Sequence, residues 1–287
     1  MLGDRPSPMD TAPVRRVARA LLIALLCTAC GGAPSIDETI TVGGGELDVS
    51  CDGGSGPTLM FVSAIGGDDS LRTIADRFAG EANACFYFRP GDGDTAPPDG
   101  PRSASGDGSD LHELLRTAKL ATPAIIVAHS YGGFVTMALA ADHPEDIAGV
   151  VFIDASTPAA EARSYLVMSD EERAYYDSQI EPFVFVDWPR SVEEAGAALE
   201  SFPNVPSTVI TATRAFIDPC DPELPCEALQ ETWIDVQTGL AEIIGAKHVL
   251  AETSHYVHLD DPDLVVDEIR DLIERSGVNA EPTPEEG

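Results

Sequence analysis

Ser130 stands where a serine hydroxyl could be made nucleophilic. The apolar, β-branched run at 124–129 shows no alternation, which is typical of a central parallel strand buried on both faces. Apolar residues then recur with helical spacing over 134–141. We therefore expect Ser130 on a sharp turn between a strand and a helix, where the small residues Ala128 and Gly132 relieve the crowding. The alternative is an ordinary strand-to-helix turn with a capping serine.

A serine on such a turn needs a base and an acid. Its hydroxyl is a weak nucleophile until a base takes its proton, and a histidine base needs a carboxylate that holds its tautomer. Of the six histidines, His255 and His258 share the loop after the last predicted strand, at 247–251. The other four follow a buried strand, lie on helix surfaces or sit inside a strand: His129, His112, His143 and His248. The chemistry that such a set performs is acyl transfer.

Two of these segments make the chain resemble the α/β-hydrolase family. The run A-H-S-Y-G at 128–132 resembles the G-x-S-x-G nucleophile elbow, with Ala128 in place of the first glycine. The loop S-H-Y-V-H-L-D-D-P at 254–262 resembles the family's histidine loop, whose first histidine is the base, which favours His255 over His258. The resemblance implies a mostly parallel central sheet flanked by helices on both faces, with a small helical cap inserted after the sixth strand. It also implies a serine hydrolase.

The resemblance leaves two carboxylates for the acid. Many relatives carry it after the strand that follows the cap, where this chain has Asp218 beyond a predicted strand at 207–212. Others carry it at the end of the preceding strand, where Asp154 follows the apolar run 150–153. A carboxylate at a strand end is better preorganised than one on a long loop. We therefore predict Asp154 and keep Asp218 as the alternative.

Two further loops resemble family motifs. The loop S-A-I-G-G at 63–67 stands where relatives often have H-G-x-G, which implies that the backbone N–H groups of Ile65 and Tyr131 form an oxyanion hole. The run R-P-G-D-G-D-T at 89–95 resembles R-P-G-x-G-x-S, and we expect Arg89 to shape this loop. The mechanism needs no metal and no organic cofactor.

The first 29 residues have the features of an export signal. Arginines at 15, 16 and 19 precede the apolar run 20–26, which is too short to span a bilayer. The small residues before Cys30 resemble the lipobox of bacterial lipoproteins, which implies that Cys30 is the lipidated first residue of the mature chain. We expect 30–37 to be a tether and the protein to be exported and lipid-anchored on the extracytoplasmic side of the cell membrane. A plain secreted protein or a short membrane anchor is the alternative.

The chain is strongly acidic. Its 49 aspartates and glutamates against 17 lysines and arginines give a net charge of −32. Such a field repels phosphate backbones and anionic lipid surfaces. We therefore expect no nucleic-acid partner and no membrane contact except through the lipid. The expected partner is a small ester-like substrate, and the oligomeric state is left open.

Four cysteines remain beyond the signal once Cys30 is assigned to lipid. An even number in an exported protein predicts two disulfides, for which three pairings are possible. In the resembled fold the end of the second strand lies beside the start of the fourth, which favours Cys51–Cys85 and leaves Cys220–Cys226. Metal binding is weaker, because no pair has two-residue spacing with histidines nearby.

The same periodicities place the elements that must position these residues. We predict strands at 38–42, 46–51, 58–62, 84–88, 124–129, 150–153, 207–212 and 247–251. We predict helices at 71–78 behind a capping Ser70, and at 111–118, 134–141, 169–180, 191–201, 233–244 and 262–276, the last with Asp261 as its N-cap. The Pro-, Gly-, Ser- and Asp-rich stretch 96–109 is expected to be an exposed connection.

The domain boundaries follow from these elements. We expect the hydrolase domain at 38–277, its cap at about 157–206 and a disordered tail at 278–287. The aromatic residues of the cap could line a substrate cavity, but we expect most of them to hold the cap in place: Tyr165, Tyr175, Tyr176, Phe183, Phe185 and Trp188.

Three functions are compatible with the sequence. The first is a hydrolase that cleaves a carboxylic ester, a lactone or an amide through an acyl-enzyme on Ser130. The second is a catalytically inactive binding lipoprotein of the same fold, because Ala128 and the missing His-Gly pair depart from the family pattern. The third is an acyltransferase.

Overall fold

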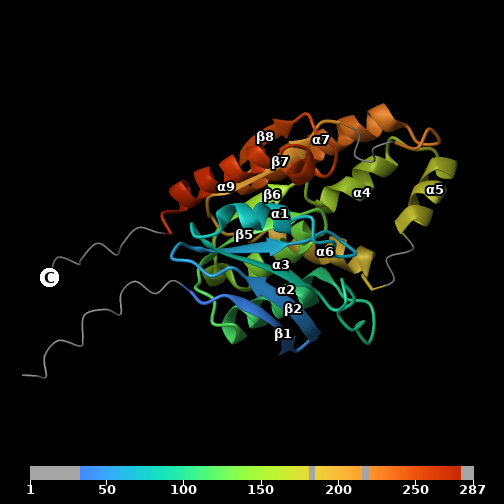
Figure 1. The fold of residues 1–287 in the computed structure, drawn as a ribbon. Helices are drawn as coiled ribbons and strands as arrows, with labels where there is room; N and C mark the ends of the chain where they lie inside the picture. Colours follow the sequence, from blue (N-terminus) through green and yellow to red (C-terminus); the bar gives the residue numbers. More distant parts are fainter. Residues whose placement is uncertain (1–32, 181–184, 215–219, 279–287) are drawn as a thin grey trace, which may run out of the picture. The chain divides into compact units, whose positions relative to one another are not determined.

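One mixed sheet organises the protein (Figure 1). The computed structural model describes residues 33–180, 185–214 and 220–278, and within them eight strands follow the order β1-β2-β4-β3-β5-β6-β7-β8. β2 runs antiparallel to β1 and β4, and the other neighbours are parallel. The strands are β1 (Ile36–Val42), β2 (Gly45–Cys51), β3 (Thr58–Val62), β4 (Asn83–Phe88), β5 (Ala124–His129), β6 (Ile147–Ile153), β7 (Ser207–Ala212) and β8 (Lys247–Ala251). The predicted mostly parallel sheet is confirmed.

Helices cover both faces of this sheet (Figure 1). α2, α3, α6 and α7 share one core with the sheet, and α1 and α9 share the other. The helices are α1 (Arg72–Ala75), α2 (Ala104–Thr117), α3 (Gly132–Asp142), α4 (Pro158–Tyr165), α5 (Asp170–Ile180), α6 (Trp188–Leu199), α7 (Cys226–Ile244), α8 (Val257–Asp260) and α9 (Pro262–Ser276). Asp261 caps α9 as predicted, since its side chain accepts from the Leu264 N–H at 3.1 Å.

Neighbouring residues of the central strand enter opposite cores, which explains the missing alternation in the sequence. Ile126 and Ala128 of β5 belong to the core under α2 and α3, whereas Ile125 and Val127 belong to the core under α1 and α9. All four side chains are fully buried. Burial on both sides holds the end of β5, and with it the turn at Ser130, in a fixed place.

The segment between β6 and β7 holds α4, α5 and α6. α6 packs against α2 and α3, and its Ala195 is fully buried. The Trp188 ring at its start lies 5.3 Å from the Phe134 ring of α3. α6 therefore extends the helical layer on one face of the sheet, and the bounds of a separate cap stay a prediction.

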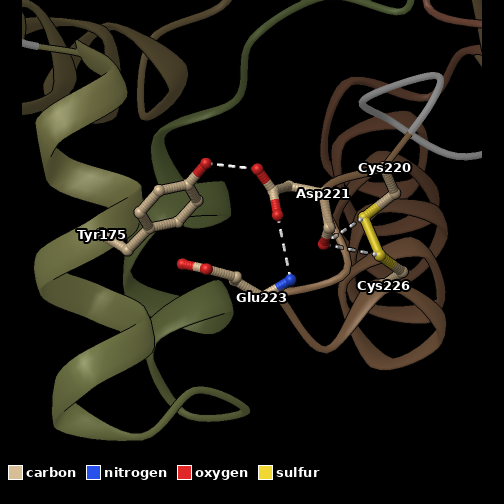
Figure 2. The surroundings of a disulfide bond; sticks show 5 residues. All are labelled: Tyr175, Cys220, Asp221, Glu223 and Cys226. Atoms are coloured by element: carbon tan, nitrogen blue, oxygen red, sulfur yellow. Dashed lines mark hydrogen bonds between the residues drawn. A yellow bond between two sulfur atoms is a disulfide. The ribbon is translucent and has the colours of Figure 1, made fainter.

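The tyrosines of this segment hold it against the start of α7. A small core contains Met168, Leu224 and Leu229 with Tyr165, Tyr175 and Tyr176 packed around them. Figure 2 shows the Tyr175 hydroxyl donating to Asp221, which also accepts from the Glu223 N–H at 2.9 Å. Asp221 lies in the loop closed by Cys220 and Cys226. These contacts agree with the expectation that the tyrosines hold the segment in place; Phe183 lies outside the described residues.

The stretch expected as an exposed connection, 96–109, is partly helical and partly buried. α2 begins at Ala104, and Asp107 and Asp110 are buried because both pair with Arg102. Gly108 allows α2 to approach α3, since a Cβ there would lie 3.0 Å from a backbone nitrogen of α3. The prediction was right for 96–101 but wrong for 104–109, because glycines and aspartates, which are common in loops, here serve close packing and ion pairing.

Both predicted disulfides are present. Cys51 of β2 and Cys85 of β4 are direct partners in the register, and a bond joins them. Cys220 and Cys226 form the second bond. Two disulfides are typical of proteins from an oxidising compartment.

The ends of the domain differ from the prediction. The predicted tether overlaps β1, because Ile36 pairs with Cys51 and packs against the core, and Ala33 already pairs with Gly54. At the other end, Val278 of the predicted tail packs against the core. The signal segment 1–29, Cys30 and most of the tail lie outside the described residues. In the part that is described, no helix has the length and apolarity needed to cross a membrane.

Candidate active site

Ser130 lies on the turn between β5 and α3 in a backbone conformation that few residues adopt. Its φ is 51°, in the left-handed region. Gly132 is required beside it, because a Cβ there would lie 2.4 Å from the carbonyl oxygen of Val62 at the end of β3. Ser130 is half-buried, and its hydroxyl makes no hydrogen bond with another described residue. The sequence predicted this strand, turn and helix correctly.

Asp154 is the carboxylate that the structure brings to the predicted base. It directly follows β6, is fully buried and has a φ of 41°. Its Oδ2 accepts from His255 Nδ1 at 2.7 Å. Its Oδ1 accepts from the Ala212 N–H at 2.9 Å and from Trp233 Nε1 at 2.7 Å. Three donors therefore hold a carboxylate in one orientation. Asp218, the alternative acid, lies outside the described residues.

The Ser130 turn adjoins this carboxylate through the backbone. The Ser130 N–H donates to the Ile153 carbonyl at 3.4 Å, and the Ser156 N–H donates to the Ser130 carbonyl at 2.8 Å. These bonds bracket Asp154. The structure thus places Ser130 and Asp154 at the ends of the neighbouring strands β5 and β6, and it places His255 on the Asp154 carboxylate.

His129 supports the His255 loop, a contact that sequence reasoning missed. Its Nε2 lies 3.0 Å from the His255 carbonyl oxygen, and since a carbonyl only accepts, His129 donates. Burial lowers the pKa of His129 well below its ordinary value, so the ring is neutral. Its ring centre lies 4.7 Å from that of His255.

The backbone N–H groups of Ile65 and Tyr131 are available to an oxygen atom. Neither donates a hydrogen bond within the described residues. Tyr131 is fully buried, and a buried N–H without a partner is rare in proteins. Tyr131 follows Ser130, and the loop with Ile65 follows β3, which pairs with β5. Both predicted N–H donors therefore lie near the Ser130 turn, and neither has a hydrogen-bond acceptor among the described residues.

The side chain of Tyr131 contacts a buried ion pair between Asp107 and Arg102. Sequence reasoning did not connect this pair with the site. The Tyr131 hydroxyl donates to Asp107 at 3.1 Å, and Asp107 pairs with Arg102 at 2.7 Å. Burial, with the nearby Asp107, raises the pKa of Tyr131, so its hydroxyl remains a donor. The aspartates of the G-D-G-S-D run at 106–110 were the available signal, but their burial depends on a tertiary contact with Arg102.

A cavity of about 220 Å³ adjoins the loop at 63–67. Its walls include Ile65, Gly66, Arg89, Asp92, Arg102 and Asp107, together with Phe185 and Val186. Ser130 and His255 do not line it. The cavity is therefore lined by the loop at 63–67 and by the charged residues packed against it, and not by Ser130 or His255.

His258 makes a different contact from His255. Its Nε2 lies 2.7 Å from the Ser70 hydroxyl oxygen, and burial lowers the pKa of His258 to about 4. Ser70 does not cap α1 as predicted, since the helix begins after Leu71 without a side-chain cap. The Ser70 hydroxyl instead contacts Asp68 and His258.

The remaining histidines form contacts of their own. His112 stacks on His143 with ring centres 3.5 Å apart, and its Nδ1 lies 2.6 Å from Asp146. His248 lies 2.9 Å from the Thr211 hydroxyl. Among the residues described, no three His, Cys, Asp or Glu side chains are grouped as metal ligands would be.

Comparison with known proteins agrees with this architecture. A family model described as the Alpha/beta hydrolase family matches residues 74–268, more than half of the chain. The uncharacterized protein YqjL of Bacillus subtilis (strain 168) is 22% identical over 224 residues, which cover 74% of this chain and 82% of that protein.

Solved structures share the fold at low sequence identity. An alpha/beta hydrolase fold protein from Burkholderia ambifaria is 17% identical with a TM-score of 0.59, covering 83% of this chain and 99% of its own. Carboxylesterase CesB (YbfK) from Bacillus subtilis is 11% identical with a TM-score of 0.58, covering 84% and 92%. At these identities the likeness shows the fold alone.

Proposed function

Because the chain belongs to the alpha/beta hydrolase family, we propose that it is a serine hydrolase that cleaves a carboxylic ester. Ser130 is the nucleophile, His255 the base and Asp154 the acid. The observation that carries this proposal is the 2.7 Å bond from His255 Nδ1 to a buried Asp154 carboxylate beside the strained Ser130 turn.

The geometry supports a defined proton path. Because the Asp154 carboxylate accepts from Nδ1–H, neutral His255 carries its lone pair on Nε2. Nε2 takes the Ser130 proton as the serine oxygen attacks the ester carbonyl, and the imidazolium that forms is stabilised by Asp154. His255 then donates this proton to the leaving alcohol, and an acyl-enzyme remains on Ser130. A water molecule, deprotonated by His255, attacks the acyl-enzyme, and His255 returns the proton to Ser130 as the carboxylic acid product leaves.

The negative oxygen of the tetrahedral intermediate is assigned to the N–H groups of Ile65 and Tyr131. Both are unpaired within the described residues, so no internal bond must break when the oxyanion forms. The hydroxyl of Ser130 has no hydrogen bond to another described residue, and serine–histidine contacts often tighten only when substrate is bound.

The substrate class is a small ester, lactone or amide. CesB, which shares the fold, is a carboxylesterase. The acidic surface disfavours phosphate-bearing macromolecules as partners. We also propose that the protein is exported and lipid-anchored through Cys30; two disulfides support an oxidising compartment. Replacing Cys30 by alanine should release the protein from membranes, and retention would contradict the anchor.

A fluorophosphonate probe and chromogenic esters of graded chain length test the hydrolase proposal. Wild type should be labelled and should turn over at least one ester. Ser130→Ala should lose labelling and lower kcat at least about 10⁴-fold. Ser70→Ala is the matched control, because the Ser70 hydroxyl also contacts a histidine ring, and it should keep both properties.

The alternatives predict other results. Folded wild type that is neither labelled nor active would favour a binding lipoprotein. Transfer of the acyl group to an added alcohol in preference to water would favour an acyltransferase. Equal labelling of wild type and Ser130→Ala would exclude Ser130 as the nucleophile.

A further inference from the structure

Arg89 lies between the two segments that carry the proposed oxyanion donors. It directly follows β4 and is only 5% exposed. Its Nη1 donates to the Ser63 carbonyl at 2.9 Å, and its Nη2 donates to the Ala64 carbonyl. Nη2 also lies 2.8 Å from the Asp92 carboxylate. A single buried guanidinium thus holds two consecutive carbonyls of the loop that follows β3.

These two bonds set the direction of the N–H groups that follow. In a trans peptide the C=O and N–H point in opposite directions, and the cis bond among the described residues is at Thr122–Pro123. The Ala64 carbonyl and the Ile65 N–H belong to one peptide unit. Because Arg89 holds this carbonyl, the Ile65 N–H must point away from the guanidinium.

The same side chain contacts the other donor residue. The guanidinium carbon of Arg89 lies 5.2 Å from the centre of the Tyr131 ring, within cation–π range. The far end of that ring is fixed by the bond from the hydroxyl to Asp107. The ring of Tyr131 is therefore held at its face and at its tip, which restrains the backbone N–H that follows Ser130.

The guanidinium keeps its charge in this buried place. Burial works against the charged form, but Asp92 and Asp107 outweigh it and raise the pKa of Arg89. A charged donor makes stronger hydrogen bonds to the loop carbonyls than a neutral one. Lysine cannot reproduce them, because a guanidinium presents its donors in a planar fork and an ammonium does not.

A role limited to shaping the loop at 89–95 does not account for these contacts. The ion pair with Asp92 lies within that loop and would suffice to shape it. The bonds to Ser63 and Ala64 instead reach a segment about 25 residues earlier in the chain, which carries a proposed donor.

We propose that Arg89 is the positioning residue of the oxyanion hole: it aims the Ile65 N–H and restrains Tyr131, so that both donors meet the developing oxyanion. The inference rests on the proposed hydrolase function. In this role Arg89 acts through the backbone of the 63–67 loop and the Tyr131 ring, and it transfers no proton. Its effect is on the transition state, where the charge on the oxygen appears.

Kinetics of Arg89→Met and Arg89→Lys test this role. Each preparation is titrated with the fluorophosphonate, so that kcat is expressed per reactive Ser130. We expect Arg89→Met to lower this kcat about 10- to 100-fold with little change in KM, and the affinity for a boronic acid, which forms a tetrahedral anion on serine, to fall in parallel. Arg89→Lys should recover part of the loss.

Arg72→Met is the matched control. Arg72 also donates to a neighbouring side chain, Ser50 at 2.7 Å, and lies 5.0 Å from the ring centre of Phe86. Its replacement should leave kcat per labelled site and boronic-acid affinity unchanged. A merely structural role of Arg89 would reduce the labelled fraction but not kcat per labelled site, and that result would overturn the inference.

Amide NMR gives a readout that does not depend on activity. Arg89→Met should shift the Ile65 and Tyr131 amide resonances and accelerate their hydrogen exchange, whereas Arg72→Met should not. Unchanged amides at both residues would overturn the Arg89 inference even in an active enzyme. A wild type that is never labelled would instead overturn the proposed function, so the two failures are distinguishable.

Discussion

Two histidines three positions apart, His255 in the loop after β8 and His258 in α8, differ in the group that contacts the ring. At His255 the carboxylate of Asp154 is on the ring nitrogen Nδ1. At His258 the exposed carboxylate of Asp68 is on the hydroxyl of Ser70, 2.5 Å away, and the ring follows. Both places hold a histidine and a carboxylate near a serine, which are the residue types of a catalytic triad. They differ in which nitrogen of the histidine ring carries the proton.

The position of the carboxylate decides which group can act as a base. A carboxylate only accepts, so the Ser70 proton points to Asp68 and the Ser70 oxygen accepts from His258 Nε2–H. His258 is then a donor to its serine. At Asp154 the Nδ1 proton is held by the acid, which leaves the Nε2 lone pair of His255 to take a proton. Residue types and proximity alone do not make a nucleophile.

The first prediction compares the two histidines by the same substitution. His255→Gln should lower kcat at least about 10⁴-fold, because glutamine cannot take the Ser130 proton. His258→Gln should keep kcat near that of wild type, since the amide NH₂ can still donate to Ser70. Ester hydrolysis at saturating substrate measures both. Equal losses in the two variants would contradict the assignment of His255 as the base.

The second prediction compares the two carboxylates. Asp154→Asn should lower kcat about 10³- to 10⁴-fold, because the amide no longer secures the tautomer that His255 needs. Asp68→Asn should have little effect on kcat, since it touches a serine outside the proposed chemistry. Steady-state kinetics with Asp218→Asn as a third variant decides the acid. Near-normal turnover of Asp154→Asn with collapse of Asp218→Asn would reverse the assignment.

The third prediction concerns stability and sharpens the contrast at His258. The pKa of His258 is about 4 in the folded protein and near 6.5 in the unfolded chain. Between these two pH values His258 is protonated in the unfolded chain but neutral in the folded protein. The contribution of His258 to the free energy of unfolding is fully present above about pH 6.5. It is lost as the pH falls towards 4, which lowers the free energy of unfolding by up to about 3 kcal/mol.

Urea unfolding of wild type and His258→Gln at pH 7 and pH 4.5 measures this effect. Wild type should lose more stability than the variant between the two values. The buried His129 is present in both proteins, but His258 contributes to the lowering of its pKa, so the difference measures His258 together with its effect on His129. Equal losses would show that His258 is not held neutral by burial.

Much of the site could be predicted from short segments. The strand and helix around Ser130, the strand ending at Asp154 and the loop of His255 are each encoded within about ten residues, by apolar periodicity and by small residues at the turn. Cys51–Cys85 was predictable from the strand order of the family that the chain resembles.

The support of the site was not predictable in the same way. Arg89 was expected to shape its own loop, and its bonds reach Ser63 and Ala64. Asp107 was expected in an exposed connection, and it accepts from Tyr131 in the interior. Arg89 does pair with Asp92 inside its own loop, so what the sequence missed at both residues is a distant buried partner: a charged residue shows in the sequence its preference for solvent, but not the partner that overrides it.

The sequence by itself determined the α/β architecture and the turn at Ser130, because these depend on periodicity, whereas the choice among the three disulfide pairings rested on the strand order of the resembled family. Only the tertiary structure decided that Asp154 accepts from His255, a residue 101 positions away, and that His258 donates to Ser70. The physical reason is range: backbone periodicity acts over a few residues, whereas a hydrogen bond requires two distant segments to come within about 3 Å of each other.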